Sequence, residues 1–213
     1  MKSIIIGAGP YGEVYLSYFA EAGIDIVGFL DDNDALKGTE IRGVPVLGGV
    51  SALETLKDTH GIEAVYCPLG NNLLRVKFLK YALSLGYETP NFIHPSVVIS
   101  PNVKVGSHGV YLLPSTVVMP CCDIHDFVMV SVNSVISHHT TLEEGVFLSF
   151  GVNVGASITL RKYAYIGIGA TIMTGVHELG EDCLVGAGAV VIKDVPDRAV
   201  MAGVPAKLIK YKE

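Results

Sequence analysis

The second part of the chain has an apolar residue at every sixth position. Six residues suit one short strand and its turn, so three such units close a triangular coil whose apolar positions stack inside. The pattern predicts about five coils of a parallel β-helix. We place a one-residue shift of phase between Val117 and Ile124 and another between Ile172 and Leu179. The seventeen repeat positions are Ile93, Ile99, Val105, Tyr111, Val117, Ile124, Val130, Ile136, Leu142, Leu148, Val154, Leu160, Ile166, Ile172, Leu179, Val185 and Val191.

Residues 1–90 carry a different pattern, in which short apolar runs alternate with amphipathic segments. Strands are predicted at residues 3–6, 25–30, 44–46 and 64–67, and helices at 10–22, 51–59 and 73–85. Ser51 is the expected cap of the middle helix, and Gly86 stops the last one. The alternation predicts a small parallel sheet covered by helices, half of a Rossmann-like fold. We expect two domains, residues 1–90 and 91–213.

Composition and charge exclude several classes of protein. The formal net charge is −6 with no run of Lys or Arg, which argues against a nucleic-acid partner. The start of the chain lacks a signal-peptide pattern and no run of about 20 apolar residues is present, so we expect a cytoplasmic protein without a membrane span. The four cysteines include no C-x-x-C and are expected to be buried. Exposed coil edges favour oligomerisation.

A glycine motif follows the first predicted strand. Gly7, Gly9 and Gly12 form G-x-G-x-x-G, and Asp31 comes 22 residues after Gly9. Alone, this spacing favours NAD. The motif lets backbone N–H groups approach a diphosphate at a helix N-terminus, and a nucleotide sugar carries that diphosphate too. The β-helix on the same chain favours the nucleotide sugar.

Several motifs resemble those of one enzyme family. Gly186-Ala187-Gly188-Ala189, Lys193-Asp194-Val195-Pro196 and residues 202–207 (AGVPAK) resemble the C-terminal end of hexapeptide-repeat acyltransferases. The glycine motif, Leu30-Asp31-Asp32, Gly70-Asn71-Asn72, Arg75 and Ile93-His94-Pro95-Ser96 narrow the likeness to the sialic acid O-acetyltransferase-like group. This group includes N-acetyltransferases of nucleotide-linked 4-amino-4,6-dideoxy sugars. The resemblance implies a left-handed parallel β-helix, a homotrimer with active sites between subunits, and acetyl-CoA in the groove between β-helices.

The resemblance also implies catalytic residues. His138 occupies the place of the general base, a role that suits imidazole because it titrates near neutral pH. His139 stands where relatives usually carry Glu or Asp to orient that base. The orienting group could instead be a backbone carbonyl, Asn133 or Glu143. The oxyanion donor is expected to be the backbone N–H of Ala156, one coil further along.

Further residues are expected to bind the two substrates. The pantetheine arm of acetyl-CoA is expected to pass small residues, and its phosphates to meet two lysines. In the first domain, the resemblance places the nucleotide sugar near the glycine motif and three polar residues, while Tyr11 stands where relatives often have a His near the acceptor. No metal site is expected, and extended His138 and His139 should point in opposite directions. The acetyl-CoA residues are Ile168, Gly169, Ala170, Gly186, Ala187, Lys193 and Lys207, and the sugar-nucleotide residues are Gly7, Gly9, Tyr11, Gly12, Asp31, Asp32 and Asn71.

Three functions remain open at this point. The first is acetyl transfer from acetyl-CoA to the amino group of a nucleotide-linked amino sugar, for glycan biosynthesis. The second is O-acetylation of a sialic acid or similar sugar. The third is a non-catalytic protein that senses a nucleotide, an alternative favoured by the missing acid after His138.

Overall fold

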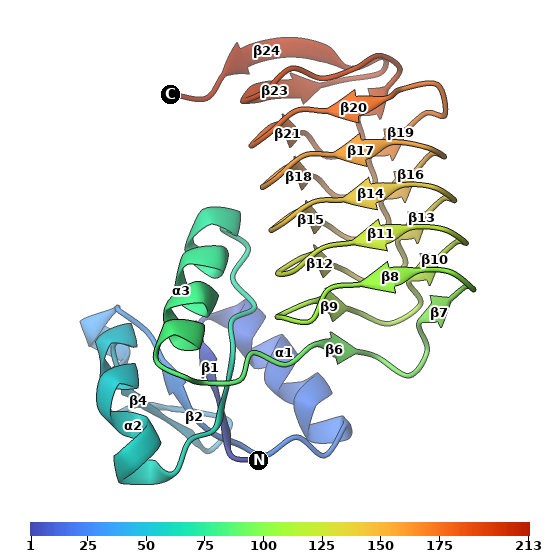
Figure 1. Ribbon diagram of the computed structural model, residues 1–213. Coiled ribbons are helices and arrows are strands. Elements are labelled where there is room, and N and C mark those ends of the chain that lie inside the picture. Colours follow the sequence, from blue (N-terminus) through green and yellow to red (C-terminus); the bar gives the residue numbers. More distant parts are fainter. The chain divides into compact units, whose positions relative to one another are not determined.

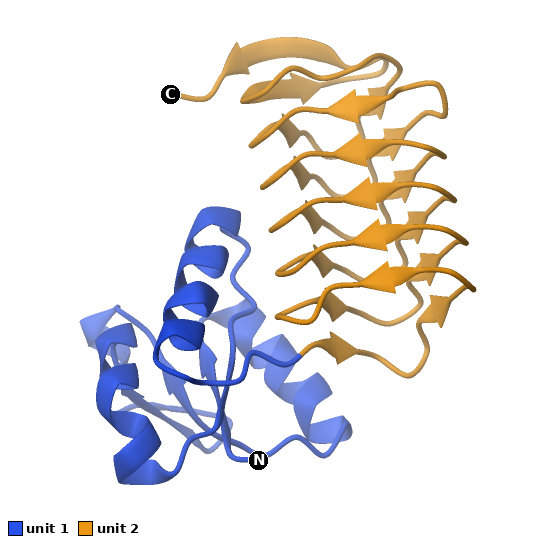
Figure 2. Cartoon of the chain, viewed as in Figure 1, with its two compact units in different colours: residues 1–90 blue, residues 91–213 orange.

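The computed structural model describes residues 1–213, which divide into two compact units, Met1–Pro90 and Asn91–Glu213 (Figure 2). We call them unit 1 and unit 2. No helix in either unit has the length and apolar character needed to cross a bilayer.

Unit 1 contains a five-stranded sheet in the order β3-β4-β2-β1-β5 (Figure 1). All neighbours pair in parallel except β3 and β4. The expected Rossmann-like architecture is therefore confirmed. The elements are β1 (Ser3–Ile6), α1 (Pro10–Glu21), β2 (Ile26–Leu30), the 3-10 turn η1 (Asp34–Leu36), β3 (Glu40–Ile41), β4 (Val44–Gly48), the 3-10 turn η2 (Val50–Ala52), α2 (Leu53–His60), β5 (Ala64–Tyr66) and α3 (Asn72–Ser84).

The helices of unit 1 begin in different ways. The predicted cap by Ser51 is wrong, because this residue lies inside the 3-10 turn η2 and α2 starts only at Leu53, without a side-chain cap. The start of α3 is capped by Asn71, whose Oδ1 accepts a hydrogen bond from the N–H of Leu74 at 3.1 Å. An Asn cap satisfies one of the four free N–H groups at a helix start.

Unit 2 is a parallel β-helix in which two-residue strands stack into three flat sheets (Figure 1). The expected left-handed β-helix is confirmed, with five complete coils from β6 to β20. Face 1 holds β6 (Phe92–Ile93), β9 (Tyr111–Leu112), β12 (Met129–Val130), β15 (Phe147–Leu148), β18 (Tyr165–Ile166), β21 (Leu184–Val185), β23 (Ala199–Ala202) and β24 (Lys207–Tyr211). Face 2 holds β7 (Val98–Ile99), β10 (Val117–Val118), β13 (Val135–Ile136), β16 (Asn153–Val154), β19 (Thr171–Ile172) and β22 (Val190–Val191). Face 3 holds β8 (Lys104–Val105), β11 (Asp123–Ile124), β14 (Thr141–Leu142), β17 (Thr159–Leu160) and β20 (Glu178–Leu179).

The apolar interior of the β-helix corrects the first predicted phase shift. Leu112 and Val118 belong to the stacked interior, and Tyr111 and Val117 do not. The extra residue therefore lies between Val105 and Leu112, whereas the second shift is found where it was predicted, between β19 and β20. Tyr111–Leu112 and Val117–Val118 are both apolar pairs, so the sequence pattern could not show which member faces inward.

The corners of the β-helix impose an unusual backbone conformation. Ten non-glycine residues of unit 2 have positive φ, among them Phe127, Asn133, His139 and Tyr163. Most lie at the corners between two faces, where glycine often takes the same conformation. The left-handed region is uncommon outside glycine, although Asn, Asp and His visit it more readily than other residues. These corners bring together most of the candidate site residues of unit 2.

Candidate functional site

His138 and His139 lie at the corner between faces 2 and 3, in the turn after β13, and both side chains are exposed. The parallel pairing of β10, β13, β16, β19 and β22 aligns successive coils at this corner. We call the resulting column the histidine corner. It consists of Pro120, His138, Ala156, Thr174 and Lys193.

The two histidine rings contact each other. Their Nδ1 atoms are 3.0 Å apart, a hydrogen-bond distance, and their planes are nearly perpendicular at 88°. The expectation that the side chains point in opposite directions is wrong. The residues form a turn and not an extended strand, and the positive φ of 59° at His139 brings its ring back toward His138.

Ala156 lies one coil above His138, as counting along the chain predicted. Its backbone N–H donates to the hydroxyl of Thr174 at 3.2 Å. Thr174 belongs to the turn that contains the second extra residue, where Gly175 has a φ of +101°. The backbone N–H of Ala156, which is expected to donate to the oxyanion, therefore already donates to a hydroxyl group that a bound substrate would have to displace.

The residues expected along the pantetheine arm gather at a different corner. Ile168, Gly169 and Ala170 follow β18 and lie beside Gly186 and Ala187, with the N–H of Gly188 bonded to the carbonyl of Ile168 at 2.8 Å. This column joins faces 1 and 2, so we call it the glycine corner, defined by Phe150, Ile168 and Ala187. Within one chain, a strand of face 2 separates it from the histidine corner. The structure therefore brings these five residues together, but not with His138.

Lys193 and Lys207 line one cavity of about 360 Å³ near the last coil. Apolar side chains complete it, including the exposed Ile192 and Leu208. Asp194 also lines the cavity, and its Oδ1 accepts hydrogen bonds from the N–H groups of His177 and Glu178. These two backbone bonds lower the pKa of Asp194 below its ordinary value. Two ammonium groups beside apolar surface can bind phosphates next to an apolar group.

A cavity of about 350 Å³ in unit 1 contains part of the predicted nucleotide site. Gly7, Asp31 and Asp32 line it. Asp31 Oδ2 accepts from the N–H of Ala8 at 2.8 Å, and Asp32 Oδ1 accepts from the N–H of Val50 at 2.8 Å. Both carboxylates thus also hold the loops around the cavity. The remaining predicted residues, Gly9, Tyr11, Gly12 and Asn71, are not among its lining residues.

Lys77 and Phe78 also line this cavity and were missed by the sequence analysis. Both lie on α3, which the sequence predicted as a helix. An ammonium group and an aromatic face beside two carboxylates suit a ligand with phosphate, base and ribose groups. Their position on a helix gave no motif, so only the folded arrangement reveals them.

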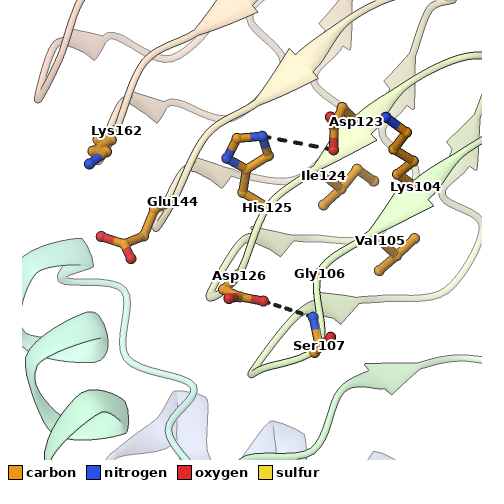
Figure 3. Close-up of a pocket in the computed structure, with 10 residues that line it drawn as sticks. All are labelled: Lys104, Val105, Gly106, Ser107, Asp123, Ile124, His125, Asp126, Glu144 and Lys162. Carbon is orange, nitrogen blue, oxygen red and sulfur yellow. Dashed lines mark hydrogen bonds and ion pairs between the residues drawn. The ribbon is translucent and has the colours of Figure 1, made fainter.

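Unit 2 has another cavity, of about 450 Å³, that the sequence did not predict (Figure 3). Its lining carries both charges, with two lysines, Lys104 and Lys162, and three acidic residues, Asp123, Asp126 and Glu144. Figure 3 shows the His125 ring directed toward Asp123, with Nε2 and Oδ1 3.8 Å apart. His125 and its acidic neighbour are thus a second candidate acid–base pair, at a site without any predicted residue. Its lining residues are Lys104, Val105, Gly106, Ser107, Asp123, Ile124, His125, Asp126, Glu144 and Lys162.

The cysteines differ in exposure. Cys67, Cys122 and Cys183 are buried, and burial raises the pKa of the Cys67 and Cys183 thiols to about 12. The expectation that all four are buried is wrong for Cys121, which is exposed because it occupies a corner with a φ of +63°. It lies one coil below His139. No group of three or more His, Cys, Asp or Glu side chains is arranged to hold a metal ion.

Comparison with known proteins identifies similar acetyltransferases. Residues 2–82 match the sequence family described as the PglD N-terminal domain. A GDP-perosamine N-acetyltransferase from Escherichia coli O157:H7 is 28% identical over 190 residues, which cover 86% of this chain and 82% of that protein. A solved structure of the Caulobacter crescentus GDP-perosamine N-acetyltransferase, a His-to-Ala variant in complex with CoA and GDP-perosamine, is 30% identical with a TM-score of 0.91. That alignment covers 99% of this chain and 97% of the other. The acetyltransferase domain of PglB from Neisseria gonorrhoeae FA1090 is 29% identical with a TM-score of 0.87, covering 98% and 99%.

Proposed function

The chain belongs to the hexapeptide-repeat acetyltransferases that carry a PglD-type N-terminal domain, and we propose that it acetylates the amino group of a nucleotide-linked amino sugar. The observation that carries this proposal is the full-length likeness to a protein whose structure holds both CoA and GDP-perosamine. A cavity in unit 1 suited to a nucleotide and a lysine-lined cavity in unit 2 support the same pair of substrates.

In the proposed reaction, His138 acts as the general base. The amine nitrogen attacks the thioester carbonyl carbon of acetyl-CoA, and a proton passes from the amine to His138 Nε2. The C–S bond then breaks and the proton is returned to the sulfur, which leaves as CoA thiol. The Ala156 N–H, once released by Thr174, donates to the oxyanion of the tetrahedral intermediate.

The substrates are assigned to the sites described above. Lys193 and Lys207 are proposed to meet the CoA phosphates in their shared cavity. The unit 1 cavity is proposed to hold the nucleotide through Gly7, Asp31, Asp32 and the newly found Lys77 and Phe78. Gly9, Gly12, Tyr11 and Asn71 then support this site or face the acceptor sugar from outside the cavity.

We further propose a homotrimer with active sites between subunits. Support comes from the separation of the glycine corner from the histidine corner within one chain. If acetyl-CoA meets both, the glycine corner comes from a neighbouring copy. We place the reaction in the cytoplasm, as a step that supplies acetylated sugars for surface glycans.

The test is a steady-state assay of CoA thiol release with acetyl-CoA and GDP-perosamine. His138→Ala should lower turnover by roughly 10²- to 10⁴-fold, the usual contribution of a general base, and leave acetyl-CoA binding intact. His125→Ala is the matched control, because it removes another exposed histidine of unit 2 and should keep activity. A loss with His125→Ala and none with His138→Ala would move the reaction to the pair of His125 and Asp123. Turnover of a sugar hydroxyl but of no amine would favour O-acetylation.

A further inference from the structure

The contacts of His138 and of the neighbouring side chains distinguish the groups that could orient the proposed base. Of the candidates open from the sequence, Glu143 is engaged elsewhere, because its Oε2 accepts from the N–H of Lys162 at 3.1 Å and lies 3.7 Å from Arg161 Nε. Asn133 belongs to the turn between β12 and β13, at the glycine corner. The carbonyl of His138 itself accepts from the N–H of Ser157. Within one chain, only His139 among these groups reaches the imidazole of His138, at 3.0 Å between the Nδ1 atoms.

We propose that His139 is the positioning residue for His138, with its Nδ1 accepting a hydrogen bond from the Nδ1–H of His138. This inference rests on the proposed acetyl transfer. A contact between two neutral imidazoles requires one Nδ1–H and one bare Nδ1, so the bond selects a pair of tautomers. With the proton on His138 Nδ1, the Nε2 of His138 carries the lone pair that a base needs. With the proton on His139 Nδ1, the Nε2 of His138 would be protonated and could not act as a base.

The same bond becomes stronger during the reaction. When His138 takes the proton of the amine it becomes an imidazolium, and its Nδ1–H then makes a charge-assisted hydrogen bond to the neutral His139. An imidazole acceptor contributes a dipole where the acid of relatives would contribute a full negative charge. His139 therefore performs the orienting part of the acid's role fully and the electrostatic part less strongly.

The corner conformation allows matched substitutions of His139. Its φ of +59° matches the +58° of Asn133 and the +62° of Phe127, so the β-helix already accommodates Asn and Phe in this conformation. His139→Asn keeps an acceptor oxygen, whereas His139→Phe keeps a planar ring and removes the acceptor. His139→Glu introduces the acid that relatives usually carry. Equal melting temperatures would show that the three variants fold alike.

The first measurement is the split of kcat and KM. His139→Phe should lower kcat by roughly 10- to 100-fold, the worth of one hydrogen bond to a charged group, with little change in either KM. His139→Asn should restore most of kcat, and His139→Glu should equal or exceed the wild type. A folded His139→Phe enzyme with normal kcat, or an Asn variant as poor as the Phe variant, would overturn the proposal.

The second measurement does not depend on the acceptor sugar. Nitrogen-15 NMR of the His-labelled protein reports the tautomer of His138, assigned with the His138→Ala and His139→Phe variants. The Nδ1–H tautomer in the wild type and in His139→Asn supports the proposal, and the Nε2–H tautomer overturns it. If the wild type fails to acetylate GDP-perosamine, the proposed substrate is refuted, while the tautomer of His138 still tests the role of His139. The two failures are therefore distinguishable.

Discussion

Gly12 provides a sharp test of the glycine motif, because alanine at this position has two opposing effects. A Cβ on Gly12 would lie 2.0 Å from the carbonyl oxygen of Gly7, far inside van der Waals contact. Alanine in a helix is favoured over glycine by up to about 1 kcal/mol. Overpacking usually costs about 1–3 kcal/mol, and the upper end applies here since the obstacle is backbone. The steric cost therefore exceeds the gain in helix propensity, and Gly12→Ala should lower the free energy of unfolding of unit 1 by roughly 2 kcal/mol.

The physical cause is the tight packing of α1 on the end of β1. Relief of the clash needs a shift of α1 by about an ångström, which disturbs the fully buried Tyr15 and Phe19. Since 1 kcal/mol moves the melting temperature of a 60–100-residue domain by about 4–8 °C, the unit 1 transition should fall by roughly 10 °C. Calorimetry measures the shift, and hydrogen exchange should show that peptides of residues 1–90 lose protection while those of unit 2 do not.

Gly9→Ala is the matched control within the same motif. A Cβ on Gly9 meets nothing within 4 Å, and its φ of −81° suits alanine. This variant should keep its melting temperature but bind GDP more weakly, because the second glycine lets backbone approach a diphosphate. A Gly12→Ala protein as stable as the wild type would refute the assigned role of Gly12 in packing.

The lysine-lined cavity, the exposed cysteine and Asp194 can each be tested directly. Changing Lys193 and Lys207 together to Ala should raise the KM for acetyl-CoA about tenfold with kcat retained, as expected for two exposed charges, and an unchanged KM would remove this cavity from CoA binding. A thiol reagent at pH 8 should modify one cysteine of the native protein quickly, and Cys121→Ser should abolish that reaction; rapid modification of several thiols would contradict the burial of Cys67 and Cys183. The pKa of Asp194 is lower in the folded than in the unfolded state, so its stabilising effect is present above the ordinary value of 3.8 and lost as pH falls through the folded pKa. Asp194→Asn should therefore melt at a lower temperature than the wild type at pH 6 and at the same temperature in strong acid, and equal melting at pH 6 would exclude the effect.

The β-helix could be predicted from sequence because its interior column must be apolar at a fixed period. The same argument failed at Tyr111 and Val117, where each strand offers two apolar residues and only packing selects the inward one. The second extra residue could be placed because Glu178, six residues after Ile172, is polar, so that only Leu179 of this strand suits the apolar interior.

The candidate site was partly predictable for similar reasons. His138, Ala156 and Lys193 could be named from motifs and counting, and the pairing of strands puts them in one column. The contact between His138 and His139 could not be foreseen, since it depends on the positive φ of a corner residue. Lys77 and Phe78 were missed because a helix residue reaches a cavity through tertiary packing, which leaves no local signal.

The regular stacking of unit 2 has a consequence for the length of the acyl donor. The histidine corner climbs three coils from His138 to Lys193. Neighbouring parallel strands lie about 4.8 Å apart, so these two side chains originate roughly 14 Å from each other along the axis. If Lys193 binds the phosphates of acetyl-CoA and His138 is the base, as proposed, the spacing of the coils sets the distance from those phosphates at which the thioester must lie. On this proposal, a donor with a shorter or longer arm would still bind at Lys193 and Lys207, but its carbonyl carbon would lie beside a different coil from that of His138.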